Sequence, residues 1–254
     1  MKWLRFRHAG DEGFGTLEGE QIAVHRGTLF GASEATGERI AVEAIEWLTP
    51  CQPTKVLALW NNFRASAEKN GWSAPTDPLY LIKAQNSLAP QRAPIPVPAA
   101  EVGRVTYEGE LAIVIGRRAK GVSVADAPAH IFGFTCANDV TAIELITRDP
   151  GFPQWTRAKG FDGFGVFGPV IETDFDFTAA SVRTTVAGRE RQNYALADCF
   201  FTPAEVVSRI SQELTLEAGD VIMFGTSLGV LPMKAGSTVE VSIDGIGTLS
   251  NTYG

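Results

Sequence analysis

Short apolar runs separated by glycine-rich turns dominate the chain, and this pattern is typical of β-strands. Three strands are expected near the N-terminus, at residues 3–6, 15–18 and 21–25. They lie within residues 1–48, which we expect to form a small β module of their own. Residues 52–254 are expected to form one larger domain, whose first strand covers residues 55–60.

Few helices are expected: Ser123 would cap the second of them, and apolar residues recur at helical spacing in the last. Helices are expected at residues 63–71, 123–130, 142–146 and 203–214. Gly71 would end the first of them, because glycine is favoured just after the last helical residue. Residues 90–98 are rich in proline and should form an extended connector. The chain is therefore expected to be an α+β protein, mostly β, with a few short helices.

Composition narrows the class of protein. Hydrophobic residues make up 44% of the chain, which is enough for a full core, and the net charge of −7 argues against a nucleic-acid-binding surface. No run of about 18 apolar residues is present. Residues 1–8 alternate apolar and basic side chains and lack the apolar middle of a signal peptide. We therefore expect a cytoplasmic protein that binds neither nucleic acid nor a membrane.

The cysteines and histidines do not form a recognisable site. Cys51, Cys136 and Cys199 are widely spaced and odd in number, so buried free thiols are expected. The three histidines are also scattered along the chain. A histidine-based zinc site or a Ser-His-Asp triad therefore has little support.

Carboxylates offer a better candidate site. Glu108 and Glu110 stand at the start of the apolar run 107–116, and alternate residues of a strand project from the same face. A hard divalent cation would relieve their repulsion, although an exposed, solvated strand edge would also explain them. Asp139 ends a second apolar run. There it is either a third ligand or the N-cap of the helix that follows.

Four motifs in a fixed order resemble those of the fumarylacetoacetate hydrolase family. They are YEGELAIVIG at 107–116, NDVTA at 138–142, KGFDGFGVFGP at 159–169 and GTSLG at 225–229. Four ordered motifs are far more specific than any one of them. The resemblance covers residues 52–254, including a final hairpin at 239–249, and implies that family's mixed β-sandwich roll. Residues 1–48 resemble the small N-terminal appendage of many bacterial members.

The resemblance also implies roles for individual residues. The metal ligands would be Glu108, Glu110 and Asp139, and the metal Mg²⁺ or Mn²⁺, with Ca²⁺ as a further option. The catalytic residues would be Lys159, as a cation beside the substrate, and Thr226, whose turn holds a substrate carboxylate. The substrate-binding residues would be Lys83, Gly225, Ser227 and Phe63. Without the resemblance, Lys159 would be a solvated surface cation, Thr226 a turn residue satisfying its own backbone, and Lys83 a strand-end cation.

The chain departs from the family pattern at two places. Family hydrolases carry a His and a Glu on a mobile lid that activates water, and the aligned positions here hold Ser66 and Lys69. Ser66 cannot act as a base without a partner, and Glu68 is displaced by one residue. After Asp139 the family often has an Arg and a nearby Gln, but this chain has IELI at 143–146. We therefore expect a more apolar pocket on that side.

The resemblance leaves three functions open. The leading prediction is a metal-dependent hydrolase or decarboxylase that cleaves a C–C bond in a small 2-oxo or diketo acid from the breakdown of aromatic compounds. The second is an isomerase or tautomerase of 2-hydroxydienoate dicarboxylates, which needs no activated water. The third is a non-catalytic protein that binds metal and ligand. If hydrolysis is nevertheless fast, Glu68 or Glu144 would be the first candidates for the base. Family members also lead us to expect a homodimer.

Overall fold

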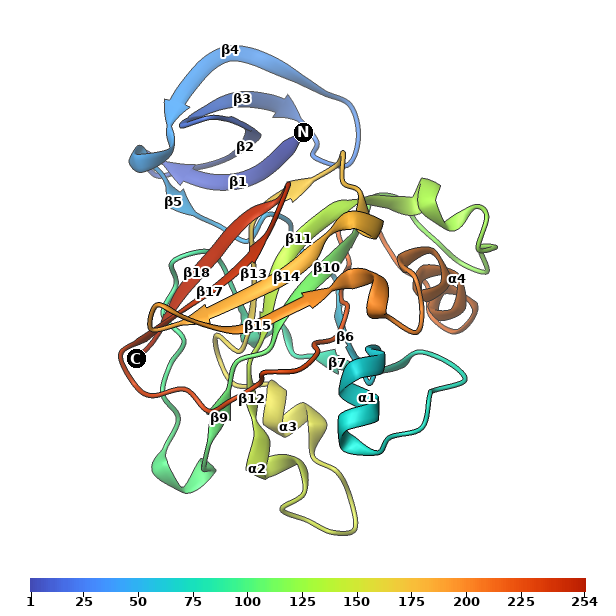
Figure 1. Ribbon diagram of the computed structural model, residues 1–254. Helices are drawn as coiled ribbons and strands as arrows, with labels where there is room; N and C mark the ends of the chain where they lie inside the picture. The colour runs from blue at the N-terminus through green and yellow to red at the C-terminus, as the bar shows by residue number, and fades with distance from the viewer.

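The N-terminal residues form an antiparallel meander at one end of a long sheet (Figure 1). The structure, a computed structural model, describes residues 1–254. The strands of the meander are β1 Lys2–His8, β2 Asp11–Glu18, β3 Gln21–Gly27 and β4 Ser33–Ala41, with β5 Glu46–Trp47 paired to β1. The strands predicted at 3–6, 15–18 and 21–25 are confirmed.

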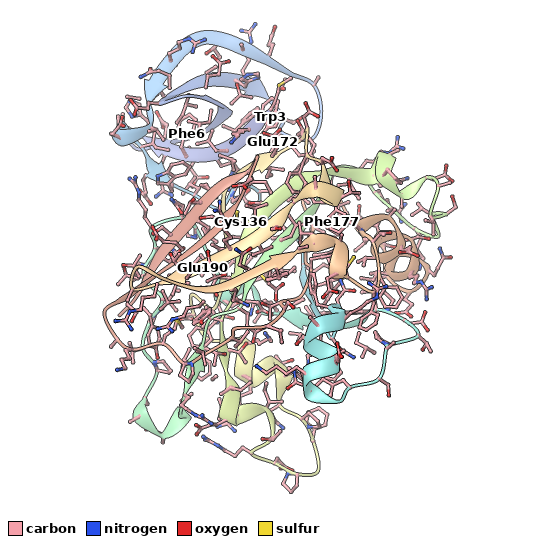
Figure 2. All side chains as sticks on the ribbon, in the orientation of Figure 1. Trp3, Phe6, Cys136, Glu172, Phe177 and Glu190 are labelled. Carbon is pink, nitrogen blue, oxygen red and sulfur yellow. The ribbon has the colours of Figure 1, made fainter.

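Strand β1 joins this meander to the rest of the protein, because it also pairs with β13 (Gly165–Glu172). Lys2 lies opposite Glu172 and Trp3 opposite Ile171. The Met1 amino group forms an ion pair with Glu172 at 2.6 Å. Figure 2 shows Trp3 and Glu172 close together at this junction. The sheet is therefore continuous from the N-terminal residues into the larger part of the chain, and a domain boundary at 48–52 stays a prediction.

The larger part continues the same sheet in the order β13-β11-β10-β16-β6-β7, and β8 pairs with β13. These further strands are β6 Val56–Trp60, β7 Leu79–Lys83, β8 Leu88–Ala89, β10 Gly109–Ile115, β11 Ile131–Asp139 and β16 Val221–Met223. Every residue of β10 and β13 is buried. Both faces of the sheet are covered there, which explains why these strands appear in the sequence as unbroken apolar runs.

A second sheet covers one face of the first. Its strands are β14 Ser181–Val186, β15 Arg189–Ala195, β17 Ser237–Ile243 and β18 Gly247–Tyr253, in the order β15-β14-β17-β18. These orange and red strands lie across β10, β11 and β13 in Figure 1. Val182 and Val241 share one hydrophobic core with Leu111 and Ile113 of β10. The predicted final hairpin and the mostly β sandwich fold are both confirmed.

The helices are short and few. They are α1 Arg64–Asn70, α2 Ile143–Ile146, α3 Trp155–Lys159 and α4 Pro203–Glu213. Gly71 ends α1 in the left-handed region with a φ of 68°, as predicted, and Thr202 caps α4 in a reciprocal arrangement with Glu205. The longest helix, α4, has only eleven residues, and the protein has no helix able to traverse a bilayer.

Single turns of 3₁₀ helix connect several of these elements. They cover Val42–Ala44, Gln85–Ser87, Ala100–Val102, Ala127–His130, Phe177–Ala179 and Leu196–Asp198. The helix predicted at 123–130 is wrong, because only the turn Ala127–His130 forms there. The Ser123 hydroxyl accepts a hydrogen bond from the Asp126 amide at 3.1 Å, which is a local turn contact. Pro128 lacks an N–H and cannot continue a regular helical ladder.

Four strand ends meet at one edge of the main sheet. Strand β10 is antiparallel to β11, and Gly109 lies opposite Asn138, so the start of β10 faces the end of β11. Strand β16 is antiparallel to β10 and parallel to β6, so β16 and β6 end at this edge as well. A tiny two-stranded sheet, β9 Val105–Thr106 with β12 Thr141–Ala142, extends beyond it. Residues far apart in the sequence are thereby brought together.

Candidate metal centre and substrate pocket

Three carboxylates converge where β10 begins and β11 ends. One oxygen from each of Glu108, Glu110 and Asp139 lies within 4.8 Å of the others. Glu108 precedes the first residue of β10 and is partly exposed, whereas Glu110 and Asp139 are buried. The alternative interpretation of these carboxylates, as part of an exposed and solvated strand edge, is therefore wrong. Asp139 is not an N-cap either, because α2 begins at Ile143 with Ala142 in the capping position.

Two lysines lie inside this carboxylate group. The Lys159 ammonium, at the last residue of α3, donates to Asp139 Oδ2 at 2.5 Å and to Glu108 Oε2 at 2.9 Å. The Lys83 ammonium, at the last residue of β7, donates to Asp139 Oδ1 at 2.6 Å and to the Lys159 carbonyl at 2.7 Å. Both lysines are buried. Neither is therefore the solvated cation that its residue type alone suggests.

Burial and neighbouring charges shift the pKa values of these side chains in different directions. Burial raises the pKa of Glu110 well above its ordinary value, and the carboxylates of Asp139 and Glu108 add to the shift. Burial acts in the same direction on Asp139, but Lys159 and Lys83 outweigh it and hold the pKa of this carboxyl below its ordinary value. Burial lowers the pKa of Lys83, and Asp139 offsets this only in part. Glu110 is thus the carboxylate whose negative charge lacks a partner.

The hydrogen bonds of Glu110 test whether a cation fits here. Its Oε2 accepts from the Gly225 amide at 2.8 Å, but its Oε1 is buried and has no partner. An unpartnered ionised oxygen in the interior is costly. Three carboxylates within reach of one point form an all-oxygen donor set, which hard divalent cations such as Mg²⁺, Mn²⁺ and Ca²⁺ prefer. The residues present therefore fit a divalent metal ion.

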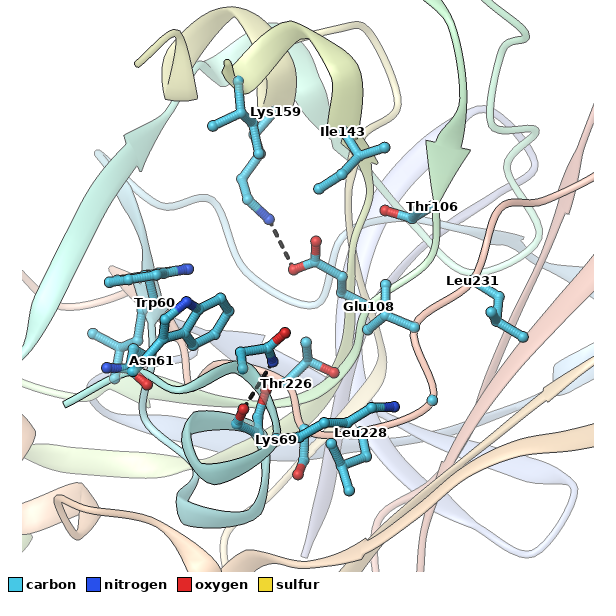
Figure 3. Close-up of a pocket in the computed structure, with 18 of the residues that line it drawn as sticks. Trp60, Asn61, Lys69, Thr106, Glu108, Ile143, Lys159, Thr226, Leu228 and Leu231 are labelled. Carbon is cyan, nitrogen blue, oxygen red and sulfur yellow. Dashed lines mark hydrogen bonds and ion pairs between the residues drawn. The ribbon is translucent and has the colours of Figure 1, made fainter. Parts of the chain in front are cut away.

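A cavity of about 500 Å³ opens beside this centre (Figure 3). Glu108, Lys159, Thr226 and Ser227 line it, and Figure 3 shows the Lys159 ammonium directed at Glu108. The Thr226 hydroxyl donates to the Gly109 carbonyl at 3.0 Å, so it mainly satisfies the local backbone. The Ser227 hydroxyl is buried and has no partner. Within this turn, Ser227 is the side chain whose hydroxyl has no hydrogen-bond partner in the protein.

Two residues that sequence reasoning missed hold this turn in place. Gln192 donates to Thr226 Oγ1 at 2.8 Å and accepts from the Gly109 amide at 3.0 Å. The Tyr194 hydroxyl donates to the Gly109 carbonyl at 2.7 Å. Both side chains point inward from β15, where they alternate with exposed residues. The strand sequence RERQNYA shows no alternation of apolar residues around Gln192, so the sequence carried no signal for its role.

Three residues predicted to bind substrate do not line the cavity. Phe63 is fully buried and packs edge-on against Tyr194 and Phe224 in the core. Lys83 lies behind Asp139, and Gly225 contributes its amide to Glu110. Because these residues touch the carboxylates or the core instead of the cavity, the structure places them in supporting positions.

Helix α1 forms another wall of the cavity. Ser66, Lys69 and Asn70 line it, and Figure 3 shows Lys69 extending into it. Glu68 is exposed and does not line the cavity. Glu144 is also absent from the wall and pairs instead with Arg104 at 2.6 Å. Neither of the two alternative bases suggested by the sequence therefore reaches the cavity directly.

Family models match nearly the whole chain. The model described as fumarylacetoacetate (FAA) hydrolase C-terminal matches residues 55–253, and the model described as Rv2993c-like, N-terminal matches residues 1–50. Oxaloacetate tautomerase YisK of Bacillus subtilis is 32% identical over 216 residues, which cover 80% of this chain and 71% of that protein.

Solved structures share all or most of the fold. 5-carboxymethyl-2-hydroxymuconate delta-isomerase from Mycobacterium smegmatis is 35% identical, with a TM-score of 0.92 over 100% of this chain and 99% of that chain. Fumarylpyruvate hydrolase from Pseudomonas aeruginosa, solved in complex with Mn²⁺ and pyruvate, is 26% identical. Its TM-score is 0.73, over 79% of this chain and 89% of that chain.

Proposed function

Because this chain belongs to the fumarylacetoacetate hydrolase family, we propose that it is a divalent-metal-dependent enzyme that tautomerises or isomerises an enolisable 2-oxo acid. One observation carries the choice of reaction. The cavity that opens beside the three carboxylates is lined by Ser66 and Lys69 on α1, where a water-activating His and Glu would be expected. Moving a proton and a double bond needs no activated water, whereas hydrolysis does.

Each part of the cavity would have a separate task. Glu108, Glu110 and Asp139 would hold Mg²⁺ or Mn²⁺, which, when bound, polarises the 2-oxo group as a Lewis acid. Lys159 would place a positive charge beside that oxygen as negative charge develops on it. Ser227 and the backbone amides of its turn would bind the substrate carboxylate. Lys83 would keep Asp139 ionised and aimed at the centre, as the 2.6 Å contact between them suggests.

Lys69 is the candidate for moving the proton. Apart from Glu108 and Lys159, only Lys69 and Arg104 bring charge to the cavity wall, and Arg104 pairs with Glu144. An ammonium group on the cavity wall can donate a proton to the substrate carbon while the enol oxygen releases its proton to solvent, and the lysine then recovers a proton from solvent, so no net proton is consumed. Ser66, one helical turn away, can hydrogen-bond to the substrate.

C–C bond cleavage is the second candidate function. The fumarylpyruvate hydrolase noted above combines Mn²⁺ and pyruvate in the same fold, and the carboxylate group found here could serve such a reaction equally well. Decarboxylation, in particular, requires no activated water. A non-catalytic binding protein would show binding without turnover. The homodimer stays a prediction.

Side-by-side assays test the proposal. The purified protein with Mg²⁺ would be given the enol form of oxaloacetate, a 2-hydroxydienoate dicarboxylate and an acylpyruvate, and loss of enol absorbance and product formation would be followed. Tautomerisation or isomerisation should exceed acylpyruvate hydrolysis by about 10²–10⁴-fold, the usual contribution of a general base. The double variant Ser66→His with Lys69→Glu should raise hydrolysis selectively. The double variant Ser66→Ala with Lys69→Gln controls for removal of the native side chains. Hydrolysis by the native protein at the rate of its other reactions would contradict the proposal.

A further inference from the structure

Three of the five tryptophans of the chain gather at the cavity. Trp60 ends β6, Trp72 follows α1, and Trp155 begins α3. The ring centroids of Trp60 and Trp72 are 4.8 Å apart, and those of Trp60 and Trp155 are 6.0 Å apart. All three line the cavity, and we call them the tryptophan wall.

The tryptophan wall is not buried in the core. Trp72 is 38% exposed, and Trp60 and Trp155 are partly exposed. By contrast, the other two tryptophans, Trp3 and Trp47, are buried. Large aromatic side chains contribute most to stability when they are covered. Three half-covered indoles along one cavity therefore mark a surface that a ligand can cover.

The tryptophan wall stands next to the groups that would hold the head of the substrate. Trp155 and Lys159 are four residues apart on α3, so they share a face and lie about 6 Å apart along its axis. Asn62, two residues after Trp60, donates to the Phe224 carbonyl at 3.0 Å. This contact ties the end of β6 to the turn that carries Ser227. If Lys159 and Ser227 hold the 2-oxo acid head of a substrate, the atoms that follow this head would therefore contact an indole of the tryptophan wall.

The size and chemistry of the rest of the cavity agree with this placement. A cavity of about 500 Å³ is in the range of pockets that take drug-sized ligands, and exceeds the needs of a four-carbon acid. Ile143, Ile146 and Leu231 contribute further apolar surface. Arg104, which could attract a second carboxylate, already pairs with Glu144.

We propose that the enzyme selects 2-oxo acids whose tail is a flat, uncharged aromatic or conjugated group that stacks on the tryptophan wall. The inference rests on the proposed function for the head group and adds the class of the tail. A tail ending in a carboxylate, bound by Lys69, is the competing occupant. It is one outcome of the test below.

Ligands that bind without reacting can measure how the tail affects affinity independently of the catalysed reaction. Oxamate mimics a 2-oxo acid but has nitrogen in place of the carbon that would enolise, so it can bind without reacting. Calorimetric titration of the Mg²⁺-supplemented protein would compare oxamate with its N-phenyl, N-cyclohexyl and N-carboxymethyl derivatives. The phenyl and cyclohexyl tails have the same number of carbons, but only the first is flat. We expect the N-phenyl compound to bind about tenfold more tightly than the N-carboxymethyl compound. It should also bind about fivefold more tightly than the N-cyclohexyl compound, in the range of aromatic pair contributions.

Variants assign the preference to the tryptophan wall. Trp155→Leu and, independently, Trp72→Leu should each weaken N-phenyloxamate binding about five- to tenfold and leave oxamate binding within twofold. Phe152→Leu is the matched control, because Phe152 is an aromatic residue 66% exposed just before α3 that does not line the cavity. It should change neither affinity.

The outcomes distinguish this inference from the proposed function. Tighter binding of the N-carboxymethyl compound, or equal affinities for all tails, would overturn the aromatic assignment and leave the head-group site intact. Unchanged N-phenyloxamate binding in both tryptophan variants would also overturn it. If oxamate itself fails to bind in the presence of Mg²⁺, the proposed function falls and this inference falls with it.

Discussion

Replacing Glu110 by glutamine should separate metal binding from folding, because this carboxylate is buried and only half satisfied. Its Oε1 has no hydrogen-bond partner in the protein, and the pKa of this carboxyl is raised well above its ordinary value, chiefly by burial. A glutamine keeps the carbonyl that accepts from the Gly225 amide. The glutamine is uncharged, so the repulsion between the Glu110 carboxylate and those of Asp139 and Glu108 is removed. We therefore expect Glu110→Gln without metal to be no less stable than the native protein.

The metal-bound protein should respond in the opposite direction. At a Mg²⁺ or Mn²⁺ concentration 100 times Kd, binding adds about 2.7 kcal/mol to the stability of the native protein. For a chain of this size, that corresponds to a rise in Tm of about 5–10 °C. Changing even a group that hydrogen-bonds to a ligand costs 10–100-fold in affinity, so loss of a ligand charge should cost at least about 100-fold. At the same metal concentration the variant would then gain only about 0.4 kcal/mol, or about 1–2 °C.

Differential scanning calorimetry of the native protein and of Glu110→Gln, with EDTA and with each metal, measures these metal-induced changes in Tm. Glu190→Gln is the control, because Glu190 is an exposed carboxylate on β15 outside the cavity. It should keep the full metal-induced shift. If the metal raises the Tm of Glu110→Gln as much as that of the native protein, the assignment of Glu110 as a ligand is refuted. A large loss of stability in EDTA would refute the view that Glu110 is an uncompensated charge.

The remaining predictions concern two lysine–aspartate contacts, that of Lys159 with Asp139 at the site and that of Lys55 with Asp220 at the opposite ends of β6 and β16. Lys159→Met should lower turnover about 100-fold or more and preserve the metal-induced rise in Tm, whereas Arg157→Met on the same helix should leave both turnover and that rise unchanged. Native turnover in Lys159→Met would contradict its role. Asp220→Asn should cost about 3 kcal/mol at pH 7, because buried Asp220 contacts Lys55 at 2.5 Å and accepts from the Glu217 amide at 2.7 Å. Burial acts to raise the pKa of Asp220, but these hydrogen bonds outweigh it and lower the pKa below its ordinary value of 3.8. The ionised form therefore stabilises the fold above about pH 4, and this contribution is lost as the pH falls through the lower, folded pKa. Urea unfolding should show the cost of Asp220→Asn shrinking below pH 4, and an equal cost at pH 3 and pH 7 would rule this explanation out.

The strands and the carboxylates were predictable because both depend on local pattern. The runs that became β10 and β11 are apolar enough to require burial on both faces, and a charged residue at either end of such a run stands out. The spacing of Glu108 and Glu110 pointed to adjacent side chains, and the structure places them together. The antiparallel register of β10 with β11 sets Gly109 opposite Asn138, and this register brings Asp139 close to Glu108 and Glu110. Sequence cannot supply that register, so the proximity of Asp139 depended on the family motif.

Residues whose role depends on packing were harder to place. Phe63 stands at the start of a predicted helix, and only the structure shows that it is buried edge-on against Tyr194 and Phe224. Lys83 ends a strand and resembles an ordinary surface cation until Asp139 is found beside it. The helix expected at 123–130 failed because a serine cap does not outweigh a proline in a short segment. The tryptophan wall draws on three separate elements, and no sequence window contains it.

The charges of the three carboxylates, the two lysines, a divalent cation and a substrate carboxylate balance one another at this site. Three ionised carboxylates and the two ammonium groups of Lys83 and Lys159 would leave the group at −1. Lys83 is buried behind Asp139, so its charge can only support that carboxylate, whereas Lys159 also faces the cavity and can act on a ligand. A divalent cation would turn the group to +1, and the carboxylate of a 2-oxo acid would then neutralise it. In that account the head of the substrate is held by charge balance, which is the same for every 2-oxo acid. Discrimination among such acids must therefore come from the uncharged part of the cavity, and the tryptophan wall is its largest aromatic surface.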